Sequence, residues 1–257
     1  MSGLEGLLAG RTLGGRYHVE AVIGRGGMGA VYRATDQRLG RQVAVKVVFV
    51  HAGDAEARER LRQRFQREAQ AAARLRHPNV VAAYDFGTDP ELGLDYFVME
   101  LLDGEDLATL LAGSGPPPAD TALDILDQAA RGLAAGHRAG LVHRDVKPGN
   151  LFLVRGEWVE EVHVKVLDFG IAQVAAEDLT LTHLTVAGRG PLSPAYASPE
   201  QLRGETRLTP ATDVFSLGAV ALQLLLGEKV LSGTPDAAAR RAEAAAGIAR
   251  LAAVPGV

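Results

Sequence analysis

The order of strand-like and helix-like segments constrains the fold of this chain most. Between Tyr17 and Leu102, apart from one long helical stretch, the apolar residues fall in short runs separated by glycines and polar turns, a pattern typical of β-strands. After Gly104 the apolar residues recur at helical spacing over longer stretches. A strand-rich part followed by a helix-rich part predicts an α+β fold, divided near residues 103–104.

Two sequence signals delimit the main helices. One helix should begin after an N-cap at Asp54 and end near Arg76, before His77-Pro78. Another should follow the three prolines at 116–118 and stop at Gly140. The other expected elements are strands over residues 17–23, 30–34, 42–50, 80–84 and 96–102, and a helix within residues 235–254.

Composition excludes several classes of protein and site. The 257 residues include 27 lysines and arginines against 31 acidic residues, a net charge of -4, whereas a nucleic-acid binder normally carries a basic excess. The chain has no cysteine, so disulfides, thiol catalysis and cysteine-ligated metals are excluded. The first ten residues lack the pattern of a signal peptide, and the longest apolar run, Val214–Leu226, is shorter than the roughly 20 residues of a membrane span. We therefore expect a cytoplasmic chain without a membrane segment.

A glycine cluster lies between the first two expected strands. Gly24, Gly26 and Gly29 fit the glycine string of dinucleotide-binding proteins, but that site requires a helix directly after the glycines. A strand-like segment, residues 31–33, follows instead. Glycines between two antiparallel strands let the backbone approach phosphate groups closely, although an ordinary glycine-rich turn has the same string.

Two charged residues stand among apolar neighbours in the first part. Lys46 interrupts an apolar strand, and Glu68 shares a helix face with apolar residues such as Ala72. A buried charge costs free energy unless it is paired, which favours an ion pair between the two side chains. The alternative is that they are unrelated, with Lys46 at a strand edge and Glu68 in solvent.

The segment from His143 to Asn150 has the highest density of chemistry-bearing side chains. It directly precedes the apolar run Leu151–Val154. A carboxylate such as Asp145 can accept a proton from a hydroxyl substrate, and an ammonium such as Lys147 can offset charge on a transferring phosphoryl group. The amide oxygen of Asn150 suits Mg²⁺ when a carboxylate is nearby. A solvated polar turn is the alternative interpretation.

The order of these motifs, with Asp168-Phe-Gly170 after a strand-like run, resembles the eukaryotic-like (Hanks-type) protein kinases, most closely the bacterial serine/threonine branch. The similarity covers roughly residues 16–227. It implies the bilobal protein kinase fold, with a small antiparallel β-sheet N-lobe that carries one long helix and a mainly α-helical C-lobe whose C-terminal helices are incomplete. The implied divisions are an N-terminal extension (1–15), the N-lobe (16–102) and the C-lobe (103–257).

The resemblance implies ATP and Mg²⁺ as cofactors and gives the residues of the nucleotide site their expected roles. Gly24, Gly26 and Gly29 would cover the phosphates, with Val31 and Ala44 beside adenine, Lys46 on the α- and β-phosphates, Glu68 as its helix partner, Met99 as gatekeeper, Glu100 to Leu102 as hinge and Phe152 as pocket floor.

The same resemblance implies roles in the second part. Asp145 is similar to the catalytic aspartate, Lys147 to the lysine typical of serine/threonine kinases, and Asn150 and Asp168 to the magnesium ligands. Asp213 resembles the aspartate that braces the catalytic loop backbone. Arg144 resembles the arginine that receives the phosphate when the activation loop is phosphorylated. The candidate acceptors in that loop are Thr180, Thr182 and Thr185, and the loop also contains Ser193.

Two departures from the family pattern stand out. The family usually shows Gly-Thr where this chain has Leu192-Ser193, and the Ser193 hydroxyl is expected to bond Asp145 and Lys147. The family also pairs the glutamate equivalent to Glu200 with an arginine from later helices. In this chain the candidates for that arginine are Arg240, Arg241 and Arg250.

The function implied by the resemblance is transfer of the γ-phosphoryl group of Mg-ATP to serine or threonine hydroxyls of proteins, including the kinase itself, in bacterial signalling. The expected partners are protein substrates and a second copy of the chain in a homodimer, without nucleic acid. The alternatives are a scaffold that binds ATP without turnover and a small-molecule kinase. Lys147 and the Ser198-Pro-Glu200 segment argue against the small-molecule kinase.

Overall fold

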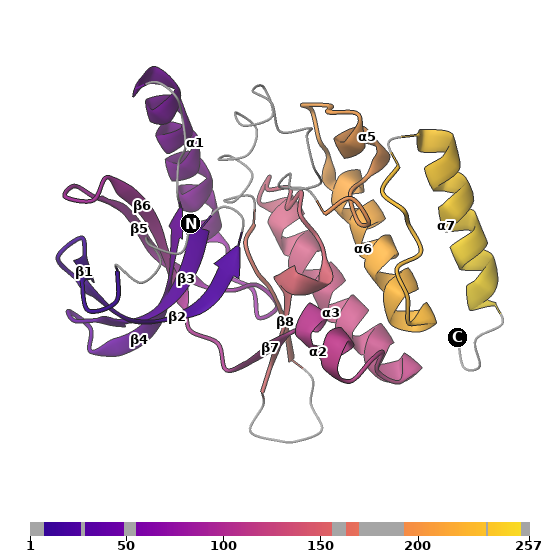
Figure 1. Cartoon of the computed structure of the whole chain (residues 1–257), viewed down its shortest axis with the longest axis horizontal. Helices are drawn as coiled ribbons and strands as arrows, with labels where there is room; N and C mark the ends of the chain where they lie inside the picture. Colours follow the sequence, from indigo (N-terminus) through magenta and orange to yellow (C-terminus); the bar gives the residue numbers. More distant parts are fainter. Residues whose placement is uncertain are drawn as a thin grey trace. The chain divides into compact units, whose positions relative to one another are not determined.

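The computed structural model describes residues 8–26, 29–48, 55–155, 163–169, 193–234 and 236–252. The chain divides into two compact units. Among the described residues, unit 1 comprises those up to Arg76 together with Val81–Leu102, and unit 2 comprises His77–Val80 and those from Asp103 onward. Each unit has its own set of packed elements, and the order predicted from the sequence, strands first and helices second, is confirmed (Figure 1).

Unit 1 is built on one antiparallel sheet. Its strands follow the spatial order β1-β2-β3-β4-β6-β5, so that consecutive strands are neighbours except where β6 lies between β4 and β5. Figure 1 shows the sheet in the indigo and violet part of the chain. The strands are β1 (Thr12–Leu13), β2 (Tyr17–Gly26), β3 (Gly29–Asp36), β4 (Arg41–Val48), β5 (Ala83–Asp89) and β6 (Leu94–Glu100).

The core of unit 1 lies on one face of this sheet. Successive strand side chains point to opposite faces, and in β3 and β4 every second residue is buried in one apolar cluster. Leu8 and Leu13 belong to the same cluster, so the described end of the segment expected as an N-terminal extension packs into unit 1. The central members of the cluster are Leu13, Tyr17, Val19, Tyr32, Ala34, Val43, Val45 and Val98, each at most 1% exposed.

The long helix of unit 1, α1 (Ala55–Arg74), agrees closely with the predicted range; its expected N-cap, Asp54, lies outside the described residues. The buried residues Ala69 and Ala72 lie along its last turns, and Leu75 follows directly. Arg62 Nε lies 3.3 Å from Asp95 Oδ1, which ties the helix to β6.

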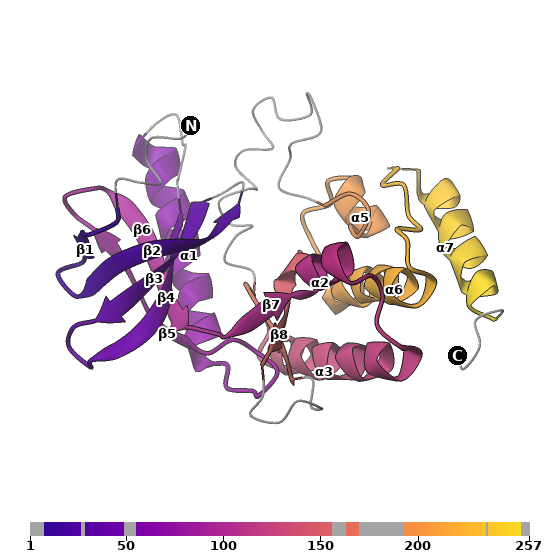
Figure 2. The same ribbon diagram turned by 60° about the horizontal axis from the view of Figure 1, so that its bottom comes forward.

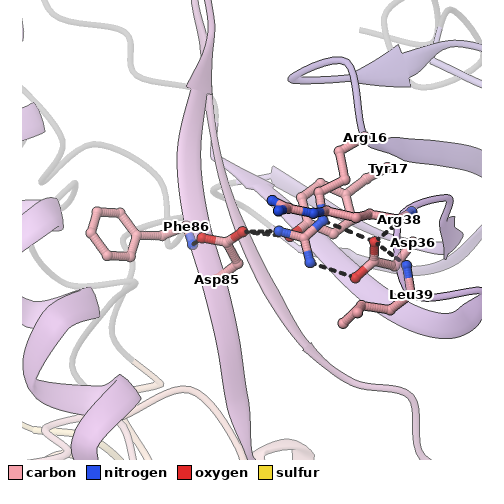
Figure 3. A network of polar contacts seen from close by, with 7 residues as sticks. All are labelled: Arg16, Tyr17, Asp36, Arg38, Leu39, Asp85 and Phe86. Atoms are coloured by element: carbon pink, nitrogen blue, oxygen red, sulfur yellow. Dashed lines mark hydrogen bonds and ion pairs between the residues drawn. The ribbon is translucent and has the colours of Figure 1, made fainter.

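A polar network joins β2, β3 and β5 (Figure 3). The guanidinium of Arg16 donates to both carboxylate oxygens of Asp36, at 2.8 and 2.7 Å, and to Asp85 at 3.0 Å. Asp85 also accepts a bond of 2.5 Å from the Tyr17 hydroxyl. The hydrogen bond from Arg16 lowers the pKa of Asp36, while desolvation, followed by the bond to Asp85, raises the pKa of Tyr17. The network therefore fixes charged groups at the edge of an apolar core.

Unit 2 is mainly helical and carries a small antiparallel sheet. The sheet has the order β7 (Gly104–Asp106), β8 (Leu151–Val154), β9 (His163–Val166). Figures 1 and 2 show α6 between α3 and α7, in agreement with the contacts of these helices. The helices are α2 (Leu107–Gly113), α3 (Ala119–Arg138), the 3-10 turn η1 (Pro148–Asn150), α5 (Pro199–Leu202), α6 (Pro210–Leu226) and α7 (Ala237–Leu251).

The ends of the helices follow the expected signals. Helix α3 ends at Arg138, and Gly140 follows with a φ of 78°, as the predicted stop requires. Helix α7 begins after Asp236, whose carboxylate accepts a hydrogen bond from Ala238 N. In the part of the chain that the structure describes, no helix is long and apolar enough to cross a bilayer.

One predicted strand is displaced. The sequence indicated a strand over residues 80–84, whereas β5 covers Ala83–Asp89. Val80 instead forms a single parallel bridge with Val166 in unit 2. The apolar run is thus divided between two packing environments, and the more polar residues after it pair with β6.

Candidate functional site

The predicted nucleotide-binding residues of unit 1 gather on one face of its sheet. Val31 is directly opposite Lys46, and Ala44 is directly opposite Met99. Because their neighbours along each strand belong to the core cluster, these side chains lie on the other face. Gly24 pairs with Val31 and extends the same row. The structure therefore brings together five residues that the sequence places up to 75 positions apart, from Gly24 to Met99.

The glycine cluster forms the end of a hairpin. Strands β2 and β3 pair as far as Gly26 and Gly29, with residues 27 and 28 outside the described part. A strand, and not a helix, follows the glycines, as predicted. This arrangement is that of a flap between two strands and lacks the helix N-terminus of a dinucleotide site.

The expected hinge lies at the end of unit 1. Glu100 is held at both of its ends to Ala82: its carboxylate accepts from Ala82 N at 2.6 Å, and its own N–H donates to Ala82 O at 3.0 Å. Leu102 is the last residue of unit 1. The side chain of Glu68 lies outside the described part, so its pairing with Lys46 stays a prediction.

In unit 2, the loop after α3 brings two predicted residues, Lys147 and Asn150, to the carboxylate of a third, Asp145. Lys147 Nζ lies 2.7 Å from Asp145 Oδ2, and the two side chains are 28% and 23% exposed. Asn150 Nδ2 donates to the same oxygen at 3.0 Å and to the Asp145 backbone oxygen at 2.7 Å. The carboxylate is thus held in one orientation while part of it stays accessible to solvent.

The two predicted magnesium ligands lie at the same end of the β8–β9 ladder. Leu151 pairs with Val166, and Leu167 N donates to Asn150 O at 2.9 Å, which leaves Asp168 next in line. The amide nitrogen of Asn150 is used on Asp145, so its amide oxygen remains for another partner.

This donor set fits a magnesium ion. Among the described residues, no group of three or more histidine, aspartate or glutamate side chains could hold a metal by itself. Mg²⁺ typically takes only one or two carboxylates from the protein and completes its shell with water and substrate phosphates. One carboxylate oxygen from Asp168 and one amide oxygen from Asn150 match this coordination preference.

The backbone at the site is strained. In the described part of the chain, the only non-glycine residues with positive φ are Arg144, at 67°, and Asp168, at 57°. Such conformations cost about 1–3 kcal/mol each and concentrate at functional sites, where the surrounding structure holds them. Both residues belong to the predicted site.

Asp213, at the start of α6, holds the strained loop. This fully buried carboxylate accepts from His143 N at 2.8 Å and from Arg144 N at 2.7 Å, and it lies 2.7 Å from His137 Nε2. The expected brace on the loop backbone is confirmed. His137 is an additional member that sequence reasoning missed, because nothing in its local sequence marks it.

His143 connects the loop to the Asp168 segment. Asp145 N donates to His143 Nδ1 at 3.2 Å, so that nitrogen is an acceptor and the proton resides on Nε2. Nε2 therefore donates to Leu167 O at 2.6 Å. The ring also packs against Phe169, with centroids 5.0 Å apart, and Phe169 in turn lies against Gly136 of α3.

The segment from Ser193 to Gln201 lines the same loop. Ser198 caps α5 in a reciprocal pair with Gln201, and Gln201 Nε2 donates to Arg144 O at 2.5 Å. A small pocket, with room for about one water molecule, is lined by Asp145, Ser193, Tyr196, Ala197 and Gln201 among others. Burial raises the pKa of Tyr196, whose hydroxyl donates to Gln223.

The structure describes Ser193 but not the three candidate acceptor threonines. The Ser193 hydroxyl was expected to bond Asp145 and Lys147, but within the described part it forms neither bond; Ser193 instead accepts from Tyr196 N through its backbone oxygen, at 2.9 Å. Thr180, Thr182 and Thr185 lie outside the described residues.

Glu200 has a hydroxyl partner, and in the described structure neither Arg240 nor Arg250, two of the arginines that could have stood in for the family's partner, pairs with it. Glu200 is half-buried and accepts from the Thr212 hydroxyl at 2.6 Å. Burial favours a higher pKa for Glu200, but the hydrogen bonds from Thr212, Ser198 and the backbone, with the charge of Arg203, together outweigh it and lower the pKa. Among the described residues, Arg240 donates to backbone carbonyls and Arg250 pairs with Glu228.

Comparisons with known proteins show the family of the chain. Residues 17–253 match the family described as protein kinase domain. The chain is 41% identical over 229 residues to the serine/threonine-protein kinase PknA of Mycobacterium tuberculosis, covering 87% of this chain and 50% of that protein. It is 39% identical to the serine/threonine-protein kinase PrkC of Bacillus subtilis, covering 88% of this chain and 33% of that protein. The chain thus spans half or less of the length of these relatives.

A solved structure gives the same result for the fold. The crystal structure of the Mycobacterium tuberculosis PknI kinase domain superposes with a TM-score of 0.68 at 29% identity, covering 91% of this chain and 85% of that one. The predicted kinase fold is thereby confirmed. The chain belongs to the protein kinase domain family, as a catalytic domain of the bacterial Hanks type.

Proposed function

We propose that this chain transfers the γ-phosphoryl group of Mg-ATP to serine or threonine hydroxyls of proteins, its own included. The observation that carries the proposal is the geometry around Asp145. Its carboxylate is oriented by Lys147 and Asn150, and its loop is braced by a buried aspartate. A polar turn without a function would not require a strained residue, Arg144, and a buried carboxylate to hold it.

In this proposal Asp145 orients the acceptor hydroxyl and takes its proton as the new oxygen–phosphorus bond forms, while the bond from the γ-phosphorus to its bridging oxygen breaks and ADP leaves. A general base must lie within hydrogen-bond reach of its proton, and the partial exposure of Asp145 permits this approach. Lys147 keeps the carboxylate in place and offsets negative charge on the phosphoryl group. Phosphoryl transfer depends mainly on such positioning and charge stabilisation, because its transition state is loose.

The remaining residues act on the nucleotide. The flap that carries Gly24, Gly26 and Gly29 covers the phosphates, and Lys46, aided by Glu68, holds the α- and β-phosphates. Bound Mg²⁺, with Asn150 and Asp168 as its protein ligands, would neutralise charge on the phosphate oxygens. The residues proposed to contact adenine are Val31, Ala44, Met99, Glu100, Leu102 and Phe152, and their shared sheet face in unit 1 supports this for Val31, Ala44 and Met99.

The proposal also covers the lobe boundaries, the loop acceptors, the location and the oligomeric state. The N-lobe would comprise residues 16–102 and the C-lobe residues 103–257, with loop acceptors among Thr180, Thr182 and Thr185. The catalytic domain would act in the cytoplasm on protein substrates. It would form a homodimer, as the family resemblance implies, and sedimentation velocity at several concentrations tests that point.

The intact mass of the purified chain before and after incubation with Mg-ATP tests the activity. The matched control is Asp145→Asn, which keeps the size of the side chain but removes its basicity. We expect mass increments of one or more phosphates on the wild type and none on the variant, with dephosphorylated casein as an added acceptor. Absence of phosphate on both the wild type and casein would contradict the proposal.

A further inference from the structure

Arg240, on α7, is the largest side chain of the described residues that is completely buried. Its Nη2 donates to two backbone oxygens of one short segment, Pro194 O at 2.8 Å and Ala197 O at 2.5 Å. The guanidinium also lies over the ring of Phe215, 5.4 Å from its centroid. Among the described residues, Nε and Nη1 of Arg240 have no hydrogen-bond partner.

Burial of such an arginine costs folding free energy. Burial lowers the pKa of Arg240, the direction that opposes its charge, and outweighs the charge of Glu243, which acts in the opposite direction. In the described part of the chain, no carboxylate accepts a hydrogen bond from its guanidinium. Buried charges with incomplete partners are often replaced by apolar residues of similar volume at no loss of stability. Stability of the core therefore does not account for an arginine at this position.

The segment that Arg240 holds also packs against Gly233. Gly233 has a φ of 82°, and a side-chain carbon there would lie 2.4 Å from Pro194 Cβ and 3.0 Å from its carbonyl carbon. Only a residue without a side chain fits this contact. Pro194 thus lies against the backbone of Gly233 and also accepts a hydrogen bond from the guanidinium of Arg240.

The same segment forms part of the pocket beside Asp145. Tyr196 and Ala197 line that pocket, and their N–H groups close a turn on Ser193 O at 2.9 and 3.2 Å. Ala197 is thus both a pocket residue and, through its carbonyl, a partner of Arg240. Any shift of the two carbonyls moves the surface that an acceptor chain would meet next to the proposed base.

We infer that Arg240 is a positioning residue that fixes the Pro194–Ala197 backbone for the protein acceptor, in a role distinct from the ion pair expected with Glu200. This inference rests on the proposed function. It assigns to α7 a part in acceptor binding and none in nucleotide binding, because both side-chain hydrogen bonds of Arg240 go to the Pro194–Ala197 segment, which shares a pocket with Asp145.

The test compares Arg240→Met with Arg241→Met, its exposed neighbour on the same helix. Phosphorylation of dephosphorylated casein gives KM for casein and for ATP, and hydrogen exchange gives the protection of the Tyr196 and Ala197 amides. For Arg240→Met we expect KM for casein to rise at least about threefold, with KM for ATP unchanged. We expect exchange of the two amides to accelerate about tenfold or more. Arg241→Met should match the wild type in all three.

Each outcome decides the point. An Arg240→Met variant with wild-type exchange and wild-type KM for casein overturns the inference. If the wild type itself does not phosphorylate casein, the proposed function fails, and the exchange measurement alone still decides the role of Arg240. If Arg240→Met loses its cooperative thermal transition, Arg240→Lys replaces it: the lysine ammonium ends one bond short of the position of Nη2, so intermediate exchange rates support the inference and wild-type rates overturn it.

Discussion

The Nε2 atom of His143 lies 2.6 Å from the carbonyl oxygen of Leu167. This bond joins the loop that carries Asp145 to the strand end that carries Asp168, although the two segments are separated by 24 positions in the sequence. The proposed base and the proposed magnesium ligand are therefore parts of one rigid arrangement within unit 2. Disturbing the neighbours of either segment should affect both.

Gly136→Ala tests this arrangement from the side of α3. A side-chain carbon at Gly136 would lie 2.1 Å from a ring carbon of Phe169, so the ring must move and shift Asp168 beside it. We expect lower thermal stability and reduced phosphorylation of casein, although alanine is favoured over glycine within a helix by about 1 kcal/mol. Differential scanning calorimetry and the casein assay measure both effects.

The matched control for that substitution is Gly218→Ala on α6. Gly218 is exposed, and no atom lies within 4 Å of its would-be side chain. Here only the helix preference acts, so stability should rise slightly and activity should stay unchanged. Equal behaviour of the two alanine variants would show that Phe169 does not depend on Gly136.

Asp213→Ala should destabilise unit 2 and abolish activity. The substitution leaves the N–H groups of His143 and Arg144 without their acceptor, and each buried unpaired group costs about 1–3 kcal/mol. Urea unfolding measures the loss of stability, and Asp124→Ala, an exposed residue on α3, serves as the control with no expected change. An Asp213→Ala variant as stable as Asp124→Ala would mean that the loop holds its shape without the brace.

Lys147→Met should act on catalysis more than on stability. The Lys147–Asp145 pair is partly exposed, so its contribution to folding is about 1 kcal/mol or less. Loss of charge stabilisation at the phosphoryl group should lower kcat about a hundredfold, with KM for ATP little changed. Steady-state kinetics beside Lys229→Met, an exposed lysine, measures the effect. Wild-type kcat in Lys147→Met would remove Lys147 from the mechanism.

Asp36→Asn should make the stability of unit 1 less dependent on pH. Folding lowers the pKa of Asp36, mainly through its hydrogen bond with Arg16. The folded chain thus binds this proton less tightly than the unfolded chain, so the stabilisation is complete above the ordinary carboxylate pKa of about 3.9 and is lost as the pH falls through the lowered value.

The pH series therefore has a definite expected form. At neutral pH Asp36→Asn should be less stable than the wild type by about 1–3 kcal/mol, and the difference should shrink toward zero in strong acid. Urea unfolding between about pH 7 and pH 2 measures it, with Glu91→Gln, an exposed residue, as the control. A difference that stays constant over this range would show that the Asp36 charge does not stabilise the folded state.

The sequence predicted the site better than it predicted the edges of the elements. Asp145, Lys147 and Asn150 lie within six residues of one another, so local sequence already placed them in one loop, and the structure brings them into contact. Helices α1 and α3 were predicted closely for a similar reason, because their periodicity and stop signals are local.

Features that depend on distant partners could not be predicted in the same way. The polar strand β5 is stabilised by pairing with β6 and by the bond of Asp85 to Arg16, 69 positions away. Arg240 bonds backbone carbonyls and not Glu200 because of how α7 packs against a segment more than 40 residues earlier. Local sequence carries no signal for such contacts.

The brace at Asp213 also bears on how the protein is made. Its three partners precede it by 69 to 76 residues, so a chain growing from its amino end completes the His143–Asn150 loop long before the carboxylate that holds it exists. Until Asp213 has left the ribosome, the N–H of Arg144 lacks the carboxylate that accepts its bond and helps to hold its left-handed backbone. The nascent chain therefore acquires the geometry of its proposed active site only after Asp213 has been made, when the residues of the strand-rich unit have already been synthesised.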